Sequence, residues 1–182
     1  MSNLVALQHG PALPNRVVEL QNLPNALLAV APATPITFID GQGLENHSDY
    51  GQLVRSAKSL AAGFQAQGLQ PGDKVLLQVS LSEDILPLFW GCLFAGLNPI
   101  VVPIPVSYNL PSRALEQLEH IWKLLGHPLI CTTAALEPAL KGSSCLPEFQ
   151  NARVANIENL RQHAPIESVY QAKFDDVAFY VL

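Results

Sequence analysis

The sequence has few charged residues and no basic run. Only 14% of its 182 residues are charged, and the formal net charge is -5. Proteins that bind nucleic acid or anionic membranes display clusters of Lys and Arg, so this composition excludes both as working function classes. Hydrophobic residues make up 49% of the chain, which is a high share for a protein that carries all of its own surface. We therefore expect part of the apolar surface to pack against a segment outside this chain.

Cysteine is scarce as well. The three cysteines, Cys92, Cys131 and Cys145, include no Cys-x-x-Cys pair. Their odd number and spacing argue against a disulfide scaffold and a zinc site, and they favour a reducing cytosol. Residues 1–10 lack the basic and apolar regions of a secretory signal. We expect a cytoplasmic protein.

One long stretch has no charge at all. Residues 85–112 are rich in Leu, Phe, Val and Ile and are numerous enough to span a bilayer. Glycines and prolines interrupt this stretch, and a helix does not continue through the closely spaced Pro103 and Pro105. We expect a buried helix followed by a buried strand, with no membrane span.

Motifs for phosphate, dinucleotide and acyl-enzyme chemistry are missing. Gly63 and Gly68 have the glycine spacing of a phosphate loop, but Leu69 and Gln70 follow them where a Lys and a hydroxyl residue should contact phosphate and magnesium. No Gly-x-Gly-x-x-Gly follows a predicted strand, and no Gly-x-Ser-x-Gly surrounds a serine. We interpret Gly63 as helix interior and Gly68 as a helix end.

The titratable residues are scattered. Glu83-Asp84 and Asp175-Asp176 are adjacent carboxylates, but they precede a predicted helix and a predicted strand, where capping and turn roles fit better than cation binding. No residue is therefore predicted to be catalytic, to bind a cofactor or to bind a metal. The five histidines also lack metal-ligand spacing; they are His9, His47, His120, His127 and His163.

What the sequence does contain is a repeated order of strand and helix. Residues 1–20 show no sustained periodicity and are interpreted as a lead segment, and residues 21–182 are interpreted as one domain. Continuous apolar runs predict buried strands. The expected strands are 36–39, 74–79, 100–102, 129–132, 153–157 and 177–182.

Helices are expected between these strands, with a capping side chain before each long helix and a glycine after it. The three long helices follow Ser48 or Asp49, Ser82, and Asn109 or Ser112, and they end at Gly68, Gly96 and Gly126. Shorter helices are expected at 25–30 and 134–140. Alternating strands and helices with apolar strands predict an α/β fold, with a mainly parallel sheet, helices on both faces and right-handed crossovers.

The last residues read as an interior strand. Residues 177–182 are uniformly apolar after Asp175-Asp176, and no polar residue follows them. Chain ends normally lie at the surface, so we expect that 182 residues are a truncated form of a longer protein.

Three stretches together resemble a known superfamily. The first is residues 48–75, a helix followed by Gly-Leu-Gln-Pro-Gly-Asp and a strand; the second is 89–105, with Gly-Cys-Leu, Ala-Gly and a strand ending in Val-Pro; the third is 175–182. This order resembles the adenylate-forming (AMP-binding) enzymes, which include acyl-CoA synthetases, fatty acyl-AMP ligases and the adenylation domains of nonribosomal peptide synthetases. The resemblance covers about residues 22–182 and implies the N-terminal subdomain of the adenylate-forming ligase fold.

Some details look more like one branch of that superfamily. The Asp40-Gly41 turn, Gly91-Cys92-Leu93 and Pro103-Ile104-Pro105 are similar to the fatty acyl-AMP ligases and to loading domains of polyketide or peptide assembly lines. The resemblance implies a two-step reaction, in which a carboxylate and ATP give an acyl-adenylate and the acyl group then passes to a thiol of a carrier protein or CoA. ATP and Mg²⁺ are the implied cofactors of the full-length enzyme.

The superfamily's functional motifs lie after the position of Leu182. Its Thr/Ser-Gly-rich phosphate loop directly follows the strand that 177–182 resembles, and its ribose, adenine and lysine motifs come later. We therefore expect a fragment that is inactive alone, has no cofactor of its own and has the remainder of its ligase domain as partner. Two alternatives stay open: a non-catalytic truncated relative that serves as an interaction module in an assembly line, and an unrelated nucleotide-binding α/β domain.

Overall fold

A parallel sheet forms the centre of the computed structural model, which describes residues 22–173 and 175–181. Its four strands lie in the order β4-β3-β5-β6, and every neighbouring pair is parallel. This confirms the parallel sheet expected from the apolar runs. The strands are β3 (Lys74–Leu77), β4 (Asn98–Val101), β5 (Leu129–Thr132) and β6 (Val154–Asn156).

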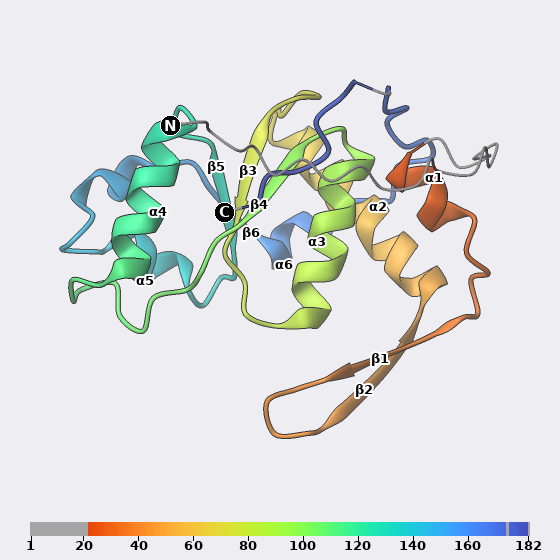
Figure 1. Cartoon of the computed structure of the whole chain (residues 1–182), viewed down its shortest axis with the longest axis horizontal. Helices are drawn as coiled ribbons and strands as arrows, with labels where there is room; N and C mark the ends of the chain where they lie inside the picture. The colour runs from red at the N-terminus through yellow and green to blue at the C-terminus, as the bar shows by residue number, and fades with distance from the viewer. Residues whose placement is uncertain (1–21, 174, 182) are drawn as a thin grey trace, which may run out of the picture.

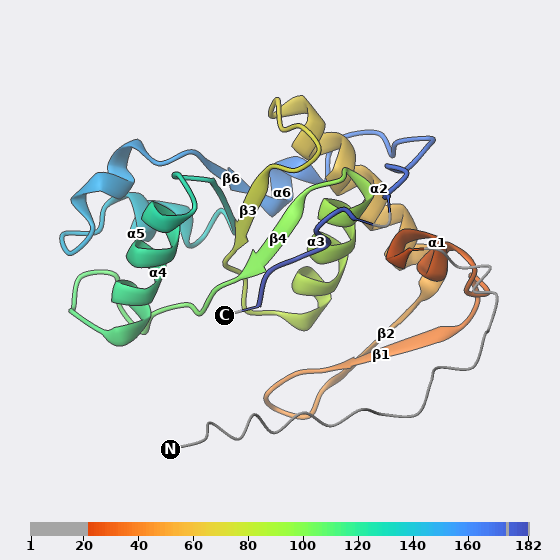
Figure 2. The same ribbon diagram turned by 45° about the horizontal axis from the view of Figure 1, so that its top comes forward.

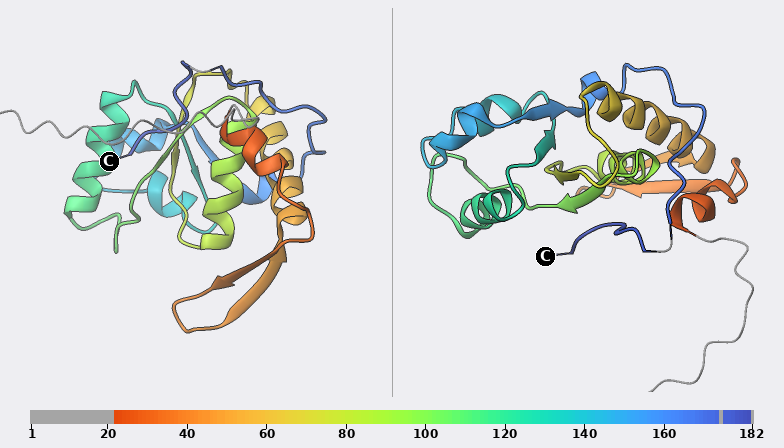
Figure 3. Two further views of the ribbon diagram at one scale, coloured as in Figure 1. Left: turned by 45° about the vertical axis from the view of Figure 1, so that its right-hand side comes forward. Right: turned by 90° about the horizontal axis from the view of Figure 1, so that it is seen from above.

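Helices cover both faces of this sheet, as Figures 1 and 3 show. Successive residues of β3 point to opposite sides, so Val75 and Leu77 join one apolar cluster and Leu76 joins the other. The first cluster includes α2 (Tyr50–Ala66), α3 (Ser82–Phe94) and α6 (Ile157–Leu160). The second includes α4 (Arg113–Leu124), α5 (Glu137–Lys141) and the 3-10 helix η1 (Pro147–Asn151). The predicted fold class is confirmed.

Two of the predicted helix caps are present. The Asp49 carboxylate accepts a hydrogen bond of 2.7 Å from the Gln52 N–H, and Ser112 Oγ accepts one of 3.3 Å from the Leu115 N–H. These bonds pair backbone donors that the first turn of a helix leaves without a partner. The prediction that Ser82 caps α3 was wrong, because Ser82 is itself the first helical residue and no side chain caps that helix.

Glycine allows the helices to pack closely. A Cβ on Gly63 would lie 2.7 Å from the Leu160 carbonyl oxygen, and one on Gly91 would lie 2.9 Å from Leu60 Cβ. Gly63 is thus the contact point of α2 with α6, which agrees with its interpretation as helix interior. Gly68 has φ +80° and follows the end of α2, as predicted.

An antiparallel hairpin precedes this layered body. Its strands are β1 (Pro35–Ile39) and β2 (Glu45–Asp49), and the short helix α1 (Leu23–Leu28) comes before them. The hairpin extends away from the sheet in Figures 1 and 2. The sequence did not predict β2, because all of its residues are polar or charged and an apolar pattern is absent.

The helix and the strand of the long uncharged stretch pack into the core as expected, whereas Val106 and Leu110 in its loop are exposed. The stretch comprises most of α3, the edge strand β4 and the loop that leads to α4. Within the part of the chain that the structure describes, no helix is long and apolar enough to cross a membrane. The shorter helices lie at 23–28 and 137–141, in place of the predicted 25–30 and 134–140. The lead segment 1–20 falls outside the described residues.

The prediction of an interior strand at 177–182 was wrong for the residues that the structure describes there. Only Tyr180 forms a β-bridge, parallel to Ile100, and the exposed fractions of Phe179 and Val181 are 41% and 83%. The reason is that β4 is an edge strand, so this segment has β4 on one side and no strand of the described residues on the other. Figures 1 and 2 show the segment, in dark blue, running beside β4.

Candidate functional site

The strand order creates one position where an α/β sheet is suited to hold a ligand. From β3 the chain passes through α3 to β4 on one side, and it then returns across β3 to β5 on the other side. The connections that follow β3 and β5 therefore lie on opposite faces of the sheet. In such folds ligands bind outside the carboxyl ends of the strands at this switch point. The carboxyl ends of β3 and β5 therefore form the candidate ligand site.

Two buried polar residues occupy this switch point. Gln78 directly follows β3 and Thr132 ends β5, and both are fully buried. The Gln78 N–H donates to the Cys131 carbonyl oxygen at 2.8 Å, and the Thr132 hydroxyl donates to the Gln78 carbonyl oxygen at 2.8 Å. The two strand ends are therefore tied to each other by backbone and side-chain hydrogen bonds.

The Gln78 side chain extends this network to the loop after β4. Its Nε2 donates to the Pro103 carbonyl oxygen at 3.1 Å, and its Oε1 accepts a hydrogen bond of 2.9 Å from the Tyr108 hydroxyl. Burial raises the pKa of Tyr108 to about 12, so the phenol remains a proton donor near neutral pH. One amide side chain thus fixes two points of the loop.

A second set of contacts holds the same loop from its other side. The Ser143 hydroxyl donates to the Tyr108 carbonyl oxygen and accepts from the Leu146 N–H at 3.1 Å. The Asn109 Oδ1 accepts from both the N–H and the hydroxyl of Ser144, at 2.9 and 3.1 Å. The segment between α5 and η1 is therefore hydrogen-bonded to the loop after β4.

This polar network positions the backbone of the connections that follow the strands. Among the described residues, every buried side-chain nitrogen and oxygen has a hydrogen-bond partner. A satisfied network of this kind rigidifies a structure and selects one arrangement of it. Sequence reasoning missed Gln78 and Tyr108, and the only available signal was a polar residue between apolar Leu77 and Val79 in a strand read as fully buried.

The carboxylates Glu83 and Asp84 lie in the first turn of α3, where they favour the positive end of the helix dipole as predicted. Asp84 Oδ1 lies 2.7 Å from an Arg161 guanidinium nitrogen, which joins α3 to the end of α6. Glu83 accepts a hydrogen bond from the Asn46 side chain of the hairpin. A cavity of about 320 Å³ separates the hairpin from α2 and α3 at this point. These contacts serve to attach the hairpin and α6 to the body.

The second carboxylate pair has a turn role, as predicted. The Asp176 carboxylate accepts from the Lys173 N–H at 2.8 Å and from the Tyr170 hydroxyl at 3.0 Å. Both hydrogen bonds lower the pKa of Asp176 from its ordinary value, and the Lys173 N–H has a larger effect than the Tyr170 hydroxyl. A cavity of about 520 Å³ lies beside this turn, at the amino ends of β3 and β4 and thus away from the switch point.

Cysteines and histidines do not gather into a site in the part of the chain that the structure describes, where no three His, Cys, Asp or Glu side chains are placed to hold a metal ion. Cys92 and Cys131 are buried in the apolar cluster of α2 and α3, and burial raises the pKa of both thiols. Cys145 is partly exposed. Four histidines are distributed over separate elements and loops, and His9 falls outside the described residues.

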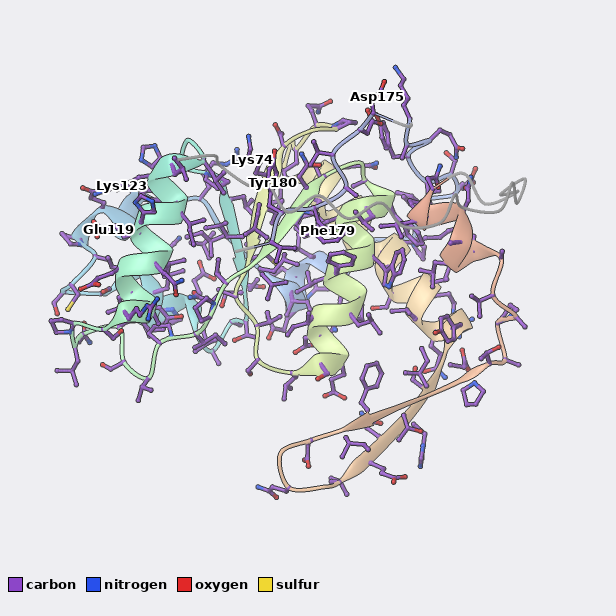
Figure 4. All side chains as sticks on the ribbon, in the orientation of Figure 1. Lys74, Glu119, Lys123, Asp175, Phe179 and Tyr180 are labelled. Carbon is purple, nitrogen blue, oxygen red and sulfur yellow. The ribbon has the colours of Figure 1, made fainter. Side chains whose placement is uncertain are left out.

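The segment that ends the described chain makes few contacts. The Tyr180 N–H donates to the Pro99 carbonyl oxygen at 3.3 Å, and the Phe179 ring packs edge-on to Phe89 of α3 with 5.4 Å between ring centroids. Figure 4 shows Phe179 over α3 and Tyr180 beside the sheet. An apolar strip of Val177, Phe179, Tyr180 and Val181 thus stays largely exposed along β4.

Comparison with known proteins gives a consistent result. The family model described as AMP-binding enzyme matches residues 29–179. One similar solved structure is the adenylation domain of a keto acid-selecting nonribosomal peptide synthetase module with keto acyl adenylate bound. It is 31% identical to this chain, with a TM-score of 0.80, and the match covers 87% of this chain and 30% of that chain. The fatty acid AMP ligase of Legionella pneumophila is 23% identical with a TM-score of 0.72, over 88% and 28% of the two chains, which supports the shared fold.

A curated relative agrees with these structures. The fatty acid–[acyl-carrier-protein] ligase ScoC of Streptomyces coeruleorubidus is 28% identical over 116 residues, which are 64% of this chain and 20% of the relative. The chain thus spans between a fifth and a third of the length of these proteins. Because the family model matches residues 29–179, well over half of the sequence, this protein belongs to the AMP-binding enzyme family, the adenylate-forming ligases.

Proposed function

We propose that this chain is the N-terminal part of an ATP-dependent acyl-activating ligase. The complete enzyme would convert a carboxylate and ATP into an acyl-adenylate and pyrophosphate, and it would then pass the acyl group to a thiol of a carrier protein or CoA. The observation that carries the proposal is the family match over residues 29–179 together with the same arrangement of sheet and helices in an adenylation domain solved with its acyl-adenylate.

We propose that the groups that bind ATP and Mg²⁺ lie outside the described residues. The described residues place no three acidic, His or Cys side chains together, and the glycines at 63 and 68 belong to a helix interior and a helix end. Leu69 and Gln70 follow, without the amine and hydroxyl groups that contact phosphate in a phosphate loop. We therefore assign the phosphate-binding groups to sequence that follows Leu182, and no residue of this chain receives a catalytic role.

The proposed role of this chain is structural: it forms the N-terminal subdomain and positions the loop after β4. Large aliphatic and aromatic residues of α2 and α3, such as Leu60, Phe64 and Leu88, are fully buried against the sheet. Each buried side chain of this size contributes about 1.5–3 kcal/mol relative to exposure, so this face holds the subdomain together. The network around Gln78 then fixes the loop after β4 at the carboxyl edge of the sheet.

The proposed partner of the chain is the remainder of its own ligase domain. Residues 177–181 pair with β4 on one side only, and an unpaired strand edge is a template for another strand. The exposed fraction of Val101 at the end of β4 is 45%, and that of Val177 is 51%. We propose that a strand from the rest of the domain pairs with this open side.

Carboxylate-dependent exchange between ATP and pyrophosphate tests the proposal. Two proteins are compared, the 182-residue chain and the same chain extended by its downstream coding sequence, each with a panel of fatty acids, keto acids and amino acids. We expect exchange from the extended protein and none from the shorter one. Exchange from the shorter protein would contradict the assignment of phosphate-binding groups. An extended protein that binds a carrier protein but shows no exchange would support the non-catalytic interaction module instead.

A further inference from the structure

Tyr170 attaches the end of the described chain to the body at the amino edge of the sheet. Its N–H donates to the Phe94 carbonyl oxygen at 2.8 Å. Its ring lies directly on Gly96, where a Cβ would come within 2.7 Å of the ring atom Cγ. Gly96 also has φ +75°, which a residue with a side chain rarely adopts. The backbone contact and the ring contact together fix the position of Tyr170.

Asp176 connects this fixed point to the residues that follow it. One carboxylate oxygen, Oδ2, accepts both the Tyr170 hydroxyl at 3.0 Å and the Lys173 N–H at 2.8 Å. The adjacent Asp175 takes part in none of the side-chain hydrogen bonds of the described residues, and it lies at the periphery in Figure 4. Of the two neighbouring carboxylates, Asp176 therefore accepts side-chain and backbone hydrogen bonds, and Asp175 serves as its comparison.

The segment after Asp176 has few hydrogen bonds of its own. Among the described residues, 177–181 make one backbone hydrogen bond, from Tyr180 to Pro99, and one aromatic ring pair, between Phe179 and Phe89. A one-residue slip of such a segment would move every side chain to the opposite face. One hydrogen bond and one β-bridge, both at Tyr180, are the recorded backbone pairing of this segment with β4 among the described residues.

We propose that Tyr170 and Asp176 are positioning residues, which form a clasp that sets the register of residues 177–181 on β4. The clasp thereby sets the point from which the chain beyond Leu182 starts. Its effect on catalysis rests on the proposed function, in which that following chain binds the phosphates of ATP. Two further findings accord with the clasp: the pKa of Asp176 is lowered by its donors, and the pKa of Tyr170 is raised by its hydrogen bond to Asp176.

Amide hydrogen exchange of the 182-residue chain tests the clasp without any assumption about activity. The variants are Asp176→Ala and Tyr170→Phe, and Asp175→Ala is the matched control. Removing one of these exposed hydrogen bonds should accelerate exchange of the Tyr180 amide by about two- to tenfold in both variants. The control should match the wild type, and the amides of β3 should be unchanged in all variants. Equal exchange of the Tyr180 amide in Asp176→Ala and Asp175→Ala would overturn the proposal.

The extended ligase tests the consequence for catalysis. We expect Asp176→Ala and Tyr170→Phe to raise the KM for ATP several-fold, while the KM for the carboxylate and the midpoint of thermal unfolding stay at the values of Asp175→Ala. A merely structural role would lower the unfolding midpoint and change both KM values together, and this outcome would count against positioning. An extended wild type without exchange activity would refute the proposed function, and the hydrogen-exchange result would still decide whether the clasp exists.

Discussion

Replacing Gln78 with methionine tests how strongly the network at the carboxyl edge of the sheet holds the loop after β4. Methionine has a similar volume and no hydrogen-bonding amide, so the packing around the position is largely kept. The Gln78 side chain is fully buried and bonds to the Pro103 carbonyl oxygen and the Tyr108 hydroxyl. The substitution therefore leaves one buried donor, the Tyr108 hydroxyl, without its partner, whereas the acceptor that it frees belongs to Pro103, which is exposed.

The magnitude follows from the buried donor. A buried polar group that loses its partner costs about 1–3 kcal/mol, and the Tyr108 hydroxyl is the one such group, so Gln78→Met should lower the free energy of unfolding by about 1–3 kcal/mol. Tyr108→Phe leaves only the Gln78 Oε1 without its donor and should cost about 1–3 kcal/mol. In the double variant the hydroxyl and its acceptor are both gone, so its cost should be smaller than the sum of the single costs by about 1–3 kcal/mol.

Urea unfolding, followed by the fluorescence of the two tryptophans, gives each free energy. The control cycle pairs Gln78→Met with Tyr170→Phe, whose hydroxyl lies at the amino edge of the sheet and shares no partner with Gln78. That pair should be additive within about 0.5 kcal/mol. Additive costs for Gln78 and Tyr108 would refute the reasoning, because they would mean that the two side chains do not depend on each other.

Three further outcomes are expected from the packing and the caps. Ser112→Ala should lower the free energy of unfolding by about 0.5–2 kcal/mol because α4 loses its N-cap, and Ser112→Asp should retain most of the stability. Gly63→Ala should lower the free energy of unfolding by about 1–3 kcal/mol in the same urea assay, because its Cβ would lie 2.7 Å from the Leu160 carbonyl oxygen. A Cβ at Gly41 meets no atom, so Gly41→Ala should have a stability close to that of the wild type. After treatment with iodoacetamide at pH 8, mass spectrometry should find one modified thiol, that of Cys145, in the folded chain and three modified thiols in urea. Modification of Cys92 or Cys131 without unfolding would contradict the packing.

The central sheet could be predicted from the sequence because its physical cause is local. Residues 74–77 and 129–132 are apolar runs of strand length, and burial on both faces is what such runs favour. The cap of α2 was equally predictable, since an aspartate followed by a helical apolar face has few other roles. The order of the strands in the sheet was not predicted, because it depends on which connection crosses β3.

The second strand of the hairpin and the exposure of the final segment could not be predicted from local sequence patterns. The five residues of β2 have no apolar alternation, and they form a strand because the turn after Asp40 returns them to β1. Residues 177–181 have the composition of an interior strand, but burial requires partners on both sides and the described chain provides only β4. The network of Gln78 likewise brings together residues at or after the ends of three separate strands, which no local pattern reveals.

The exposed apolar residues link the composition of the chain to its proposed place in a larger enzyme. A chain with 49% hydrophobic residues should expose some of them, and scattered exposure has no special meaning. Here Val101, Val177, Phe179, Tyr180 and Val181 are instead exposed along one sheet edge, next to an open row of backbone groups. Apolar side chains beside unpaired backbone groups favour an additional strand, because the strand satisfies both needs at once. Both the apolar excess and the exposed final segment are what the proposed function requires, because in that proposal the sheet continues in a following part of the ligase.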